Sequence, residues 1–191
     1  MIGKPSGKFV LRLDPVLHGL LQAAAKGEGT SLNQVCIQRL LGVTAPGEIR
    51  EITTVISRAA ELFGANLSGV VLFGSFARGE AMQNSDVDVL VVLNEGAAIT
   101  RDLYKRWEEK ELIVSSRTVE PSIVALPKES EPPSGLWAEV ALDGVVVWDS
   151  NGRIHRHLAR VRKNISEGKL RRENVHGQNY WIHDREAYEK R

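Results

Sequence analysis

The sequence predicts an α/β (α+β) domain built on a mixed sheet, preceded by a small strand–helix–helix module and followed by a basic helix. Between residues 48 and 148, hydrophobic runs of strand length alternate with amphipathic stretches of helical period. The segment GVTAPG, at residues 42–47, is typical of a linker and separates this part from the first two helices. We therefore expect three parts, at residues 1–44, 45–150 and 151–191.

The composition limits the classes of protein that this chain can represent. The 191 residues are 42% hydrophobic and 26% charged, so a core can form and global disorder is not expected. The one cysteine, Cys36, excludes an internal disulfide. No apolar stretch approaches the roughly 18 residues of a membrane span, and no signal-type apolar block opens the chain. We expect no membrane association and a cytoplasmic location.

The N-terminal module begins with a short strand. Residues 8–13 alternate polar and apolar side chains, apart from Val10. Asp14 and Pro15 then form a typical helix start, with an N-cap residue followed by proline at the first helical position. Leucines recur at helical spacing until glycines end the pattern. A second helix is expected over residues 31–41.

The elements of the middle part follow from hydrophobic periodicity. Apolar residues at helical spacing predict a helix over residues 48–63, and two apolar runs predict strands at about 69–74 and 87–93. Later expectations are a helix over 100–111, a strand over 122–126, one strand or a hairpin over 136–148 around Asp143-Gly144, and a basic helix over 153–167.

The chemistry-bearing residues lie between and along the two predicted strands. Asp86 and Asp88 are two positions apart on a strand, so their side chains share a face and offer the oxygen ligands that Mg²⁺ prefers. Gly74 and Ser75 end the preceding strand. A glycine there lets the backbone approach a phosphate, whose oxygens the following N–H groups and the serine hydroxyl can hold. Arg78 can add positive charge.

This segment, GSFARG followed by SDVD, resembles the DNA polymerase β-type nucleotidyltransferase family, whose signature is Gly-Ser, a spacer and Asp-x-Asp on the next strand. Its size is similar to that of minimal nucleotidyltransferases in prokaryotic toxin–antitoxin pairs. The resemblance spans residues 50–150. It implies transfer of AMP from ATP to a hydroxyl, on a partner toxin protein. It also implies catalytic and metal-binding roles for Asp86 and Asp88, and nucleotide binding by Gly74, Ser75 and Arg78.

One expected residue is missing from the pattern. The family usually has a third carboxylate on a later strand, and the aligned position falls near Ser122. Glu120 and the more distant Glu139 are the available substitutes. Two alternatives therefore stay open. One is a catalytically degenerate, DNA-binding regulator that uses the fold as a sensor or scaffold. The other is a small-molecule nucleotidyltransferase of the antibiotic-modifying kind.

Residues 8–42 are too short to bury a core alone and would need a twin, which predicts a homodimer. The segment resembles the ribbon–helix–helix family of DNA-binding domains, in which two strands pair across a dimer axis and enter the major groove. The alternative is a strand and two helices that pack on the main domain. The resemblance implies dimer-core positions for Phe9, Leu11 and Leu13, and DNA contacts from Lys8, Val10, Arg12, Ser31 and Asn33.

The C-terminal part is basic. It holds eleven Lys/Arg against five Asp/Glu, whereas residues 46–150 hold nine against seventeen. Basic side chains beside aromatics such as Tyr180 and Trp181 can bind nucleic acid. The other interpretations are a clamp on an acidic partner and a solvated helix. In the last case the apolar residues Ile154, Leu158, Val161 and Ile165 would pack on the domain.

Overall fold

The computed structural model describes residues 10–27, 29, 31–33, 35–36, 48–175 and 178–184. The strands are β1 (Leu67–Phe73), β2 (Val87–Leu93), β3 (Ile113–Val114), β4 (Arg117–Ala125), β5 (Val145–Asp149), β6 (Leu170–Val175) and β7 (Gln178–His183). The helices are α1 (Pro15–Gly27), α3 (Glu48–Phe63), α4 (Gly74–Ala77), α5 (Arg101–Glu108), α6 (Gly135–Asp143) and α7 (Arg153–Ser166), with a 3₁₀ turn at Gly64–Asn66.

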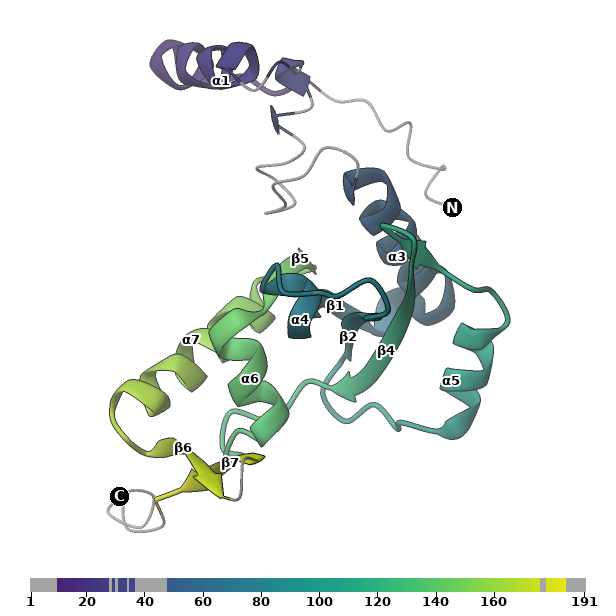
Figure 1. The fold of residues 1–191 in the computed structure, drawn as a ribbon, viewed down its shortest axis with the longest axis vertical. Coiled ribbons are helices and arrows are strands. Elements are labelled where there is room, and N and C mark those ends of the chain that lie inside the picture. The colour runs from purple at the N-terminus through teal and green to yellow at the C-terminus, as the bar shows by residue number, and fades with distance from the viewer. Residues whose placement is uncertain are drawn as a thin grey trace.

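The centre of the molecule is a five-stranded sheet in the order β3-β4-β2-β1-β5, with helices on both faces (Figure 1). β2 and β4 run parallel, while the other neighbouring pairs run antiparallel. The predicted mixed sheet is therefore confirmed. β6 and β7 form a separate antiparallel pair near the ends of α6 and α7.

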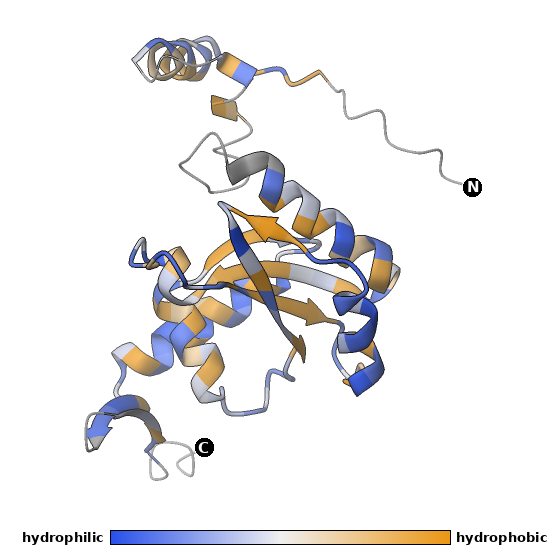
Figure 2. Cartoon of the chain, turned by 45° about the vertical axis from the view of Figure 1, so that its right-hand side comes forward, coloured by the Kyte–Doolittle hydropathy of each residue, from blue (hydrophilic) through white to orange (hydrophobic). Residues whose placement is uncertain are grey.

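Both faces of the sheet are buried, which explains why its strands are almost continuously apolar. Val87, Val89 and Val91 of β2 pack into the core beneath α3 and α5. Leu90 and Val92, on the opposite face, pack beneath α6 and α7. In Figure 2 the hydrophobic strands lie between helices whose outer surfaces are hydrophilic. β1 and β2 are thus held rigidly where they carry the motif.

Residues 136–148 form neither one strand nor a hairpin, so that prediction is wrong. They form α6 and then β5. The Ser134 hydroxyl accepts a hydrogen bond from the backbone N–H of Trp137 and caps the helix. The Gly144 N–H donates to the Val140 carbonyl at 2.8 Å, which closes the last turn before β5 begins. The glycine marks a helix–strand junction, because buried residues at helical spacing hold the preceding segment on the sheet.

Two other parts differ from the sequence prediction. β4 begins at Arg117, and a hairpin joins it to β3 through Ser115 and Ser116, whose φ angles of 50° and 62° are left-handed. Residues 10–14 form no strand, although one was predicted over residues 8–13, of which the first two lie outside the described residues. A ribbon of the resembled family forms only when a second chain supplies the pairing strand.

The basic helix is confirmed as α7, and the apolar face predicted for it is buried on the domain. The strand pair that follows is anchored to α6 through Glu139. This carboxylate accepts a hydrogen bond from Trp181 Nε1 at 2.7 Å and lies 3.3 Å from the guanidinium of Arg172. In the described part of the chain, no helix has the length and apolar character needed to cross a bilayer.

Candidate active site

The antiparallel pairing of β1 with β2 brings the motif residues to one end of the sheet. β1 ends at Phe73, whose Cα is paired with that of Asp88 near the start of β2. Gly74 and Ser75 follow at once as the first residues of α4. Asp86 lies just before β2 and is exposed, whereas Asp88 is half-buried. The Gly-Ser turn and the Asp-x-Asp pair therefore meet, as the sequence predicts.

Gly74 is required by its surroundings as well as by its backbone. Its φ angle is +71°, in the left-handed region that favours glycine. A Cβ atom at this position would lie 2.1 Å from Oδ2 of Asp88. The backbone of the turn thus lies directly against the carboxylate, and a side chain at residue 74 would fill the space where the two meet.

The surroundings of Asp88 disfavour its negative charge. Burial is the main cause that raises the pKa of Asp88, and the charge of Asp86 raises it further, while Arg78 acts in the opposite direction. A cation between the two carboxylates would relieve their mutual repulsion. The carboxylate oxygens are donors that fit Mg²⁺, which completes its shell with water and substrate phosphates.

Arg78 lies close to this site but is engaged by other acidic side chains. Its Nε donates to Oε2 of Glu80 at 2.7 Å, and its Nη1 lies 3.6 Å from Oδ2 of Asp143. The hydrogen bond that Arg78 donates to Glu80 is the main cause that raises the pKa of Arg78. Glu80 is two residues from Arg78 in sequence, whereas Asp143 comes from α6 and could not be recognised as a partner from the sequence. A phosphate bound by Arg78 would have to compete with them.

The register of the parallel strands β2 and β4 shows which residues lie next to Asp88, where a third carboxylate would be needed. Its register pairs Asp88 with Glu120, and Leu90 with Ser122. Paired residues on neighbouring strands project to the same face. Glu120 therefore stands beside Asp88, whereas Ser122 stands beside a fully buried leucine. Within the described residues, no three acidic, His or Cys side chains converge closely enough to enclose a metal ion.

The structure argues against Glu139 as the substitute. This residue lies on α6, and its carboxylate is held by the indole of Trp181 and the guanidinium of Arg172. Glu120 is exposed, and its side chain makes no hydrogen bond or ion pair within the described part of the chain. Of the two candidates, Glu120 is therefore the one whose position and freedom suit a role beside Asp88.

The predicted DNA-contacting residues are not brought near this site. Lys8 lies outside the described residues. Val10 and Arg12 are exposed and precede α1, which stands apart from the sheet (Figures 1 and 2). Ser31 and Asn33 are exposed on the segment after α1. The predicted start of α1 is confirmed, since Oδ1 of Asp14 accepts a hydrogen bond from the N–H of residue 16 at 2.9 Å.

Comparisons with known proteins find matches to two segments of the chain. Residues 52–141 match the model of the nucleotidyltransferase domain, and residues 4–40 match the HicB family. A Methanocaldococcus jannaschii protein named as a protein adenylyltransferase is 46% identical over 37 residues, which are 19% of this chain and 25% of that protein. The match thus spans a quarter of the length of that relative.

Two solved structures are similar to part of the chain. One is a toxin–antitoxin with AMP-PNP, at 16% identity and a TM-score of 0.42, covering 63% of this chain and 88% of that one. The other is a mutant of the toxin–antitoxin MntA–HpeT, at 13% identity and a TM-score of 0.41, covering 62% and 89%. The chain is thus similar to the nucleotidyltransferase domain over residues 52–141 and to the HicB family over residues 4–40.

Proposed function

We propose that this chain is a magnesium-dependent nucleotidyltransferase that moves AMP from ATP to a hydroxyl group of a partner protein, in an antitoxin-like system. The observation that carries the proposal is the contact between the Gly74 turn and the Asp88 carboxylate, where a Cβ would come within 2.1 Å of Oδ2. The match of residues 52–141 to the nucleotidyltransferase domain supports the reaction class, and the short similarity to a protein adenylyltransferase supports AMP as the group transferred.

Each part of the site has a role in this reaction. Asp86 and Asp88 would hold Mg²⁺, which neutralises charge on the phosphates when it is bound. The first N–H groups of α4 and the Ser75 hydroxyl would bind oxygens of the departing diphosphate. The acceptor oxygen bonds to the α-phosphorus as the bond to the bridging oxygen breaks. Glu120, paired with Asp88 in the β2–β4 register, would take the proton of that hydroxyl.

The experiment that tests the proposal is calorimetric titration of ATP with and without Mg²⁺. We expect Mg²⁺-dependent binding to the wild-type chain, and binding at least about 30-fold weaker in the variant Asp86→Ala/Asp88→Ala, which loses the charges that hold the cation. The matched control is Asp102→Ala/Glu109→Ala, which removes the same charge from exposed positions at the two ends of α5.

The control should bind Mg²⁺ and ATP as the wild type does. Binding that is indifferent to Mg²⁺, or equal losses in the two double variants, would contradict the proposed site. Absence of binding in the wild type would favour the catalytically degenerate regulator instead. All variants should keep the wild-type urea midpoint, because site carboxylates repel each other when no cation is present.

We also infer that residues 8–42 form a homodimeric, DNA-binding ribbon–helix–helix module. The observation that favours it is apolar exposure at the N-terminal end of the chain. Val16, Leu17 and Leu20 of α1 are 71%, 46% and 64% exposed. A second copy would cover this apolar surface and supply the pairing strand. Sedimentation at micromolar concentration should show a dimer, and a monomer would remove this inference together with the DNA contacts from Arg12.

A further inference from the structure

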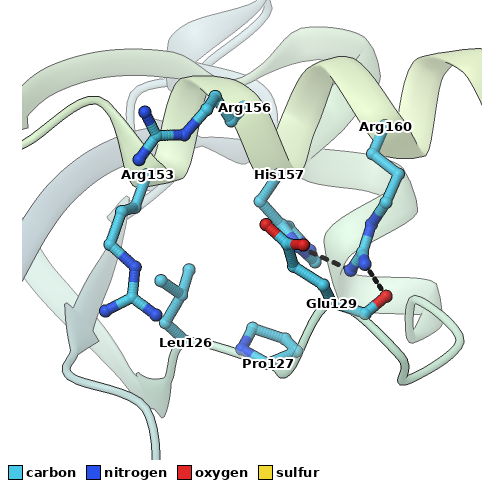
Figure 3. Close-up of a pocket in the computed structure, with 7 residues that line it drawn as sticks. All are labelled: Leu126, Pro127, Glu129, Arg153, Arg156, His157 and Arg160. Carbon is cyan, nitrogen blue, oxygen red and sulfur yellow. Dashed lines mark hydrogen bonds between the residues drawn. The ribbon is translucent and has the colours of Figure 1, made fainter.

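A cavity lies at the end of the sheet opposite the candidate active site. The N–H of Leu126 binds the carbonyl of Leu93, the last residue of β2, whereas Asp88 stands near the start of that strand. Five residues of strand at about 3.3 Å each separate the two places by about 17 Å. The cavity has a volume of about 70 Å³, room for several water-sized groups, and Figure 3 shows its lining: Leu126, Pro127, Glu129, Arg153, Arg156, His157 and Arg160.

Three arginines reach this cavity from one side of α7, because residues 153, 156, 157 and 160 share a helix face. Arg153 is paired with Glu95, at 3.0 Å. Arg160 donates to the backbone carbonyls of residues 128 and 129, and within the described residues it forms no ion pair with a carboxylate. The Arg156 side chain is exposed and has no hydrogen-bond or ion-pair partner in the described part of the chain.

His157 is a buried neighbour of Arg160 in this group. The residue is 6% exposed, and its ring meets Trp137 edge-on with centroids 4.5 Å apart. Nδ1 lies 3.1 Å from Nη2 of Arg160. A guanidinium can only donate, so Nδ1 accepts and the ring proton is on Nε2. Burial, and then the charge of Arg160, lower the pKa of His157 to about 4, so the ring is neutral at pH 7.

Nε2 of His157 is buried and has no hydrogen-bond partner in the described part of the chain. This atom is shielded from solvent, so the ring contributes to the cavity through Nδ1, which contacts the guanidinium of Arg160. The helix end itself is not a free donor, since Asp149 and Asn151 accept from the first N–H groups of α7. Side chains therefore define what this cavity can bind.

We propose that the cavity binds a phosphoryl group of a small ligand between the guanidinium groups of Arg156 and Arg160. Arginine matches tetrahedral oxyanions because its fork presents paired donors, and the neutral ring of His157 holds the guanidinium of Arg160 without adding a charge. Glu129 is the one carboxylate among the residues that line the cavity, against three guanidinium groups. This site is separate from the proposed nucleotide site and does not depend on it.

The test is titration of inorganic phosphate into the full chain in the presence of EDTA, so that a Mg²⁺-dependent nucleotide site does not contribute. Calorimetry gives the affinity, and the NMR signal of the His157 ring, which contacts Arg160 and lines the cavity, reports the place. The variant is Arg156→Gln, and its matched control is Arg171→Gln, which removes an exposed arginine of β6 that does not line the cavity. We expect about tenfold weaker binding in Arg156→Gln, because a charged hydrogen-bond donor is lost, and none of this loss in the control.

Sodium chloride at matched ionic strength should leave the His157 signal unmoved. Glycerol phosphate distinguishes the source of the phosphoryl group: tighter binding than inorganic phosphate indicates an organic ester, and equal binding indicates free phosphate. The proposal is overturned if chloride produces the same response, if the two variants weaken phosphate binding equally, or if phosphate binds while the His157 signal does not move.

Discussion

Gly74→Ala should disable the candidate active site although it adds a single methyl group. The new Cβ would lie 2.1 Å from Oδ2 of Asp88, well inside van der Waals contact. Either the carboxylate rotates away or the turn shifts, and both changes dismantle the arrangement proposed to hold the nucleotide. A displacement of about 1 Å at a reacting centre can cost 100-fold. We therefore expect Mg²⁺-dependent diphosphate release from ATP to slow about 100-fold or more, and ATP binding, measured by calorimetry, to weaken as well.

Gly79→Ala is the matched control for this substitution. Gly79 has a φ angle of +72°, almost the same as that of Gly74, but a Cβ there would meet nothing within 4 Å. Both substitutions therefore cost the same backbone strain, about 1 kcal/mol, and only one adds the clash. Urea denaturation should show the larger loss of stability in Gly74→Ala. Equal losses of ATP affinity in the two variants would show that the contact with Asp88 is unimportant.

The elements that could be predicted are those whose signal is local. The helix over residues 48–63 has the bounds expected from its apolar period, and β2 has those expected from its apolar run. The meeting of Gly74 with Asp88 also follows from the sequence, because consecutive antiparallel strands place the end of one beside the start of the next. This part of the site was predictable because Gly74 and Asp88 are close in sequence.

The parts that could not be predicted depend on contacts between distant segments. An apolar run such as residues 136–148 suits a helix or a strand, and packing against α7 and the sheet decides between them. The place of Glu120 depends on the register between β2 and β4, which α5 and β3 separate in sequence. Likewise, no local pattern joins Leu126 to His157, which meet only once α7 has packed on the sheet.

Glu120→Gln should slow AMP transfer about 100-fold while changing the affinity for Mg²⁺-bound ATP much less. The register pairs Glu120 with Asp88, its carboxylate is the base in the proposed reaction, and general-base residues typically contribute 10²–10⁴-fold. Asp86 and Asp88 remain to hold the cation. Diphosphate release from ATP with water as acceptor measures the rate without knowledge of the natural acceptor.

Glu139→Gln separates this role from that of the other candidate carboxylate. Glu139 holds Trp181 and Arg172, so its loss should lower the free energy of unfolding by about 1 kcal/mol and leave the rate of diphosphate release unchanged. The opposite pattern, a slow Glu139→Gln and a normal Glu120→Gln, would assign the third carboxylate to α6. In that case the C-terminal strand pair would have to release Glu139 before transfer, since the carboxylate cannot serve the reaction while Trp181 and Arg172 hold it.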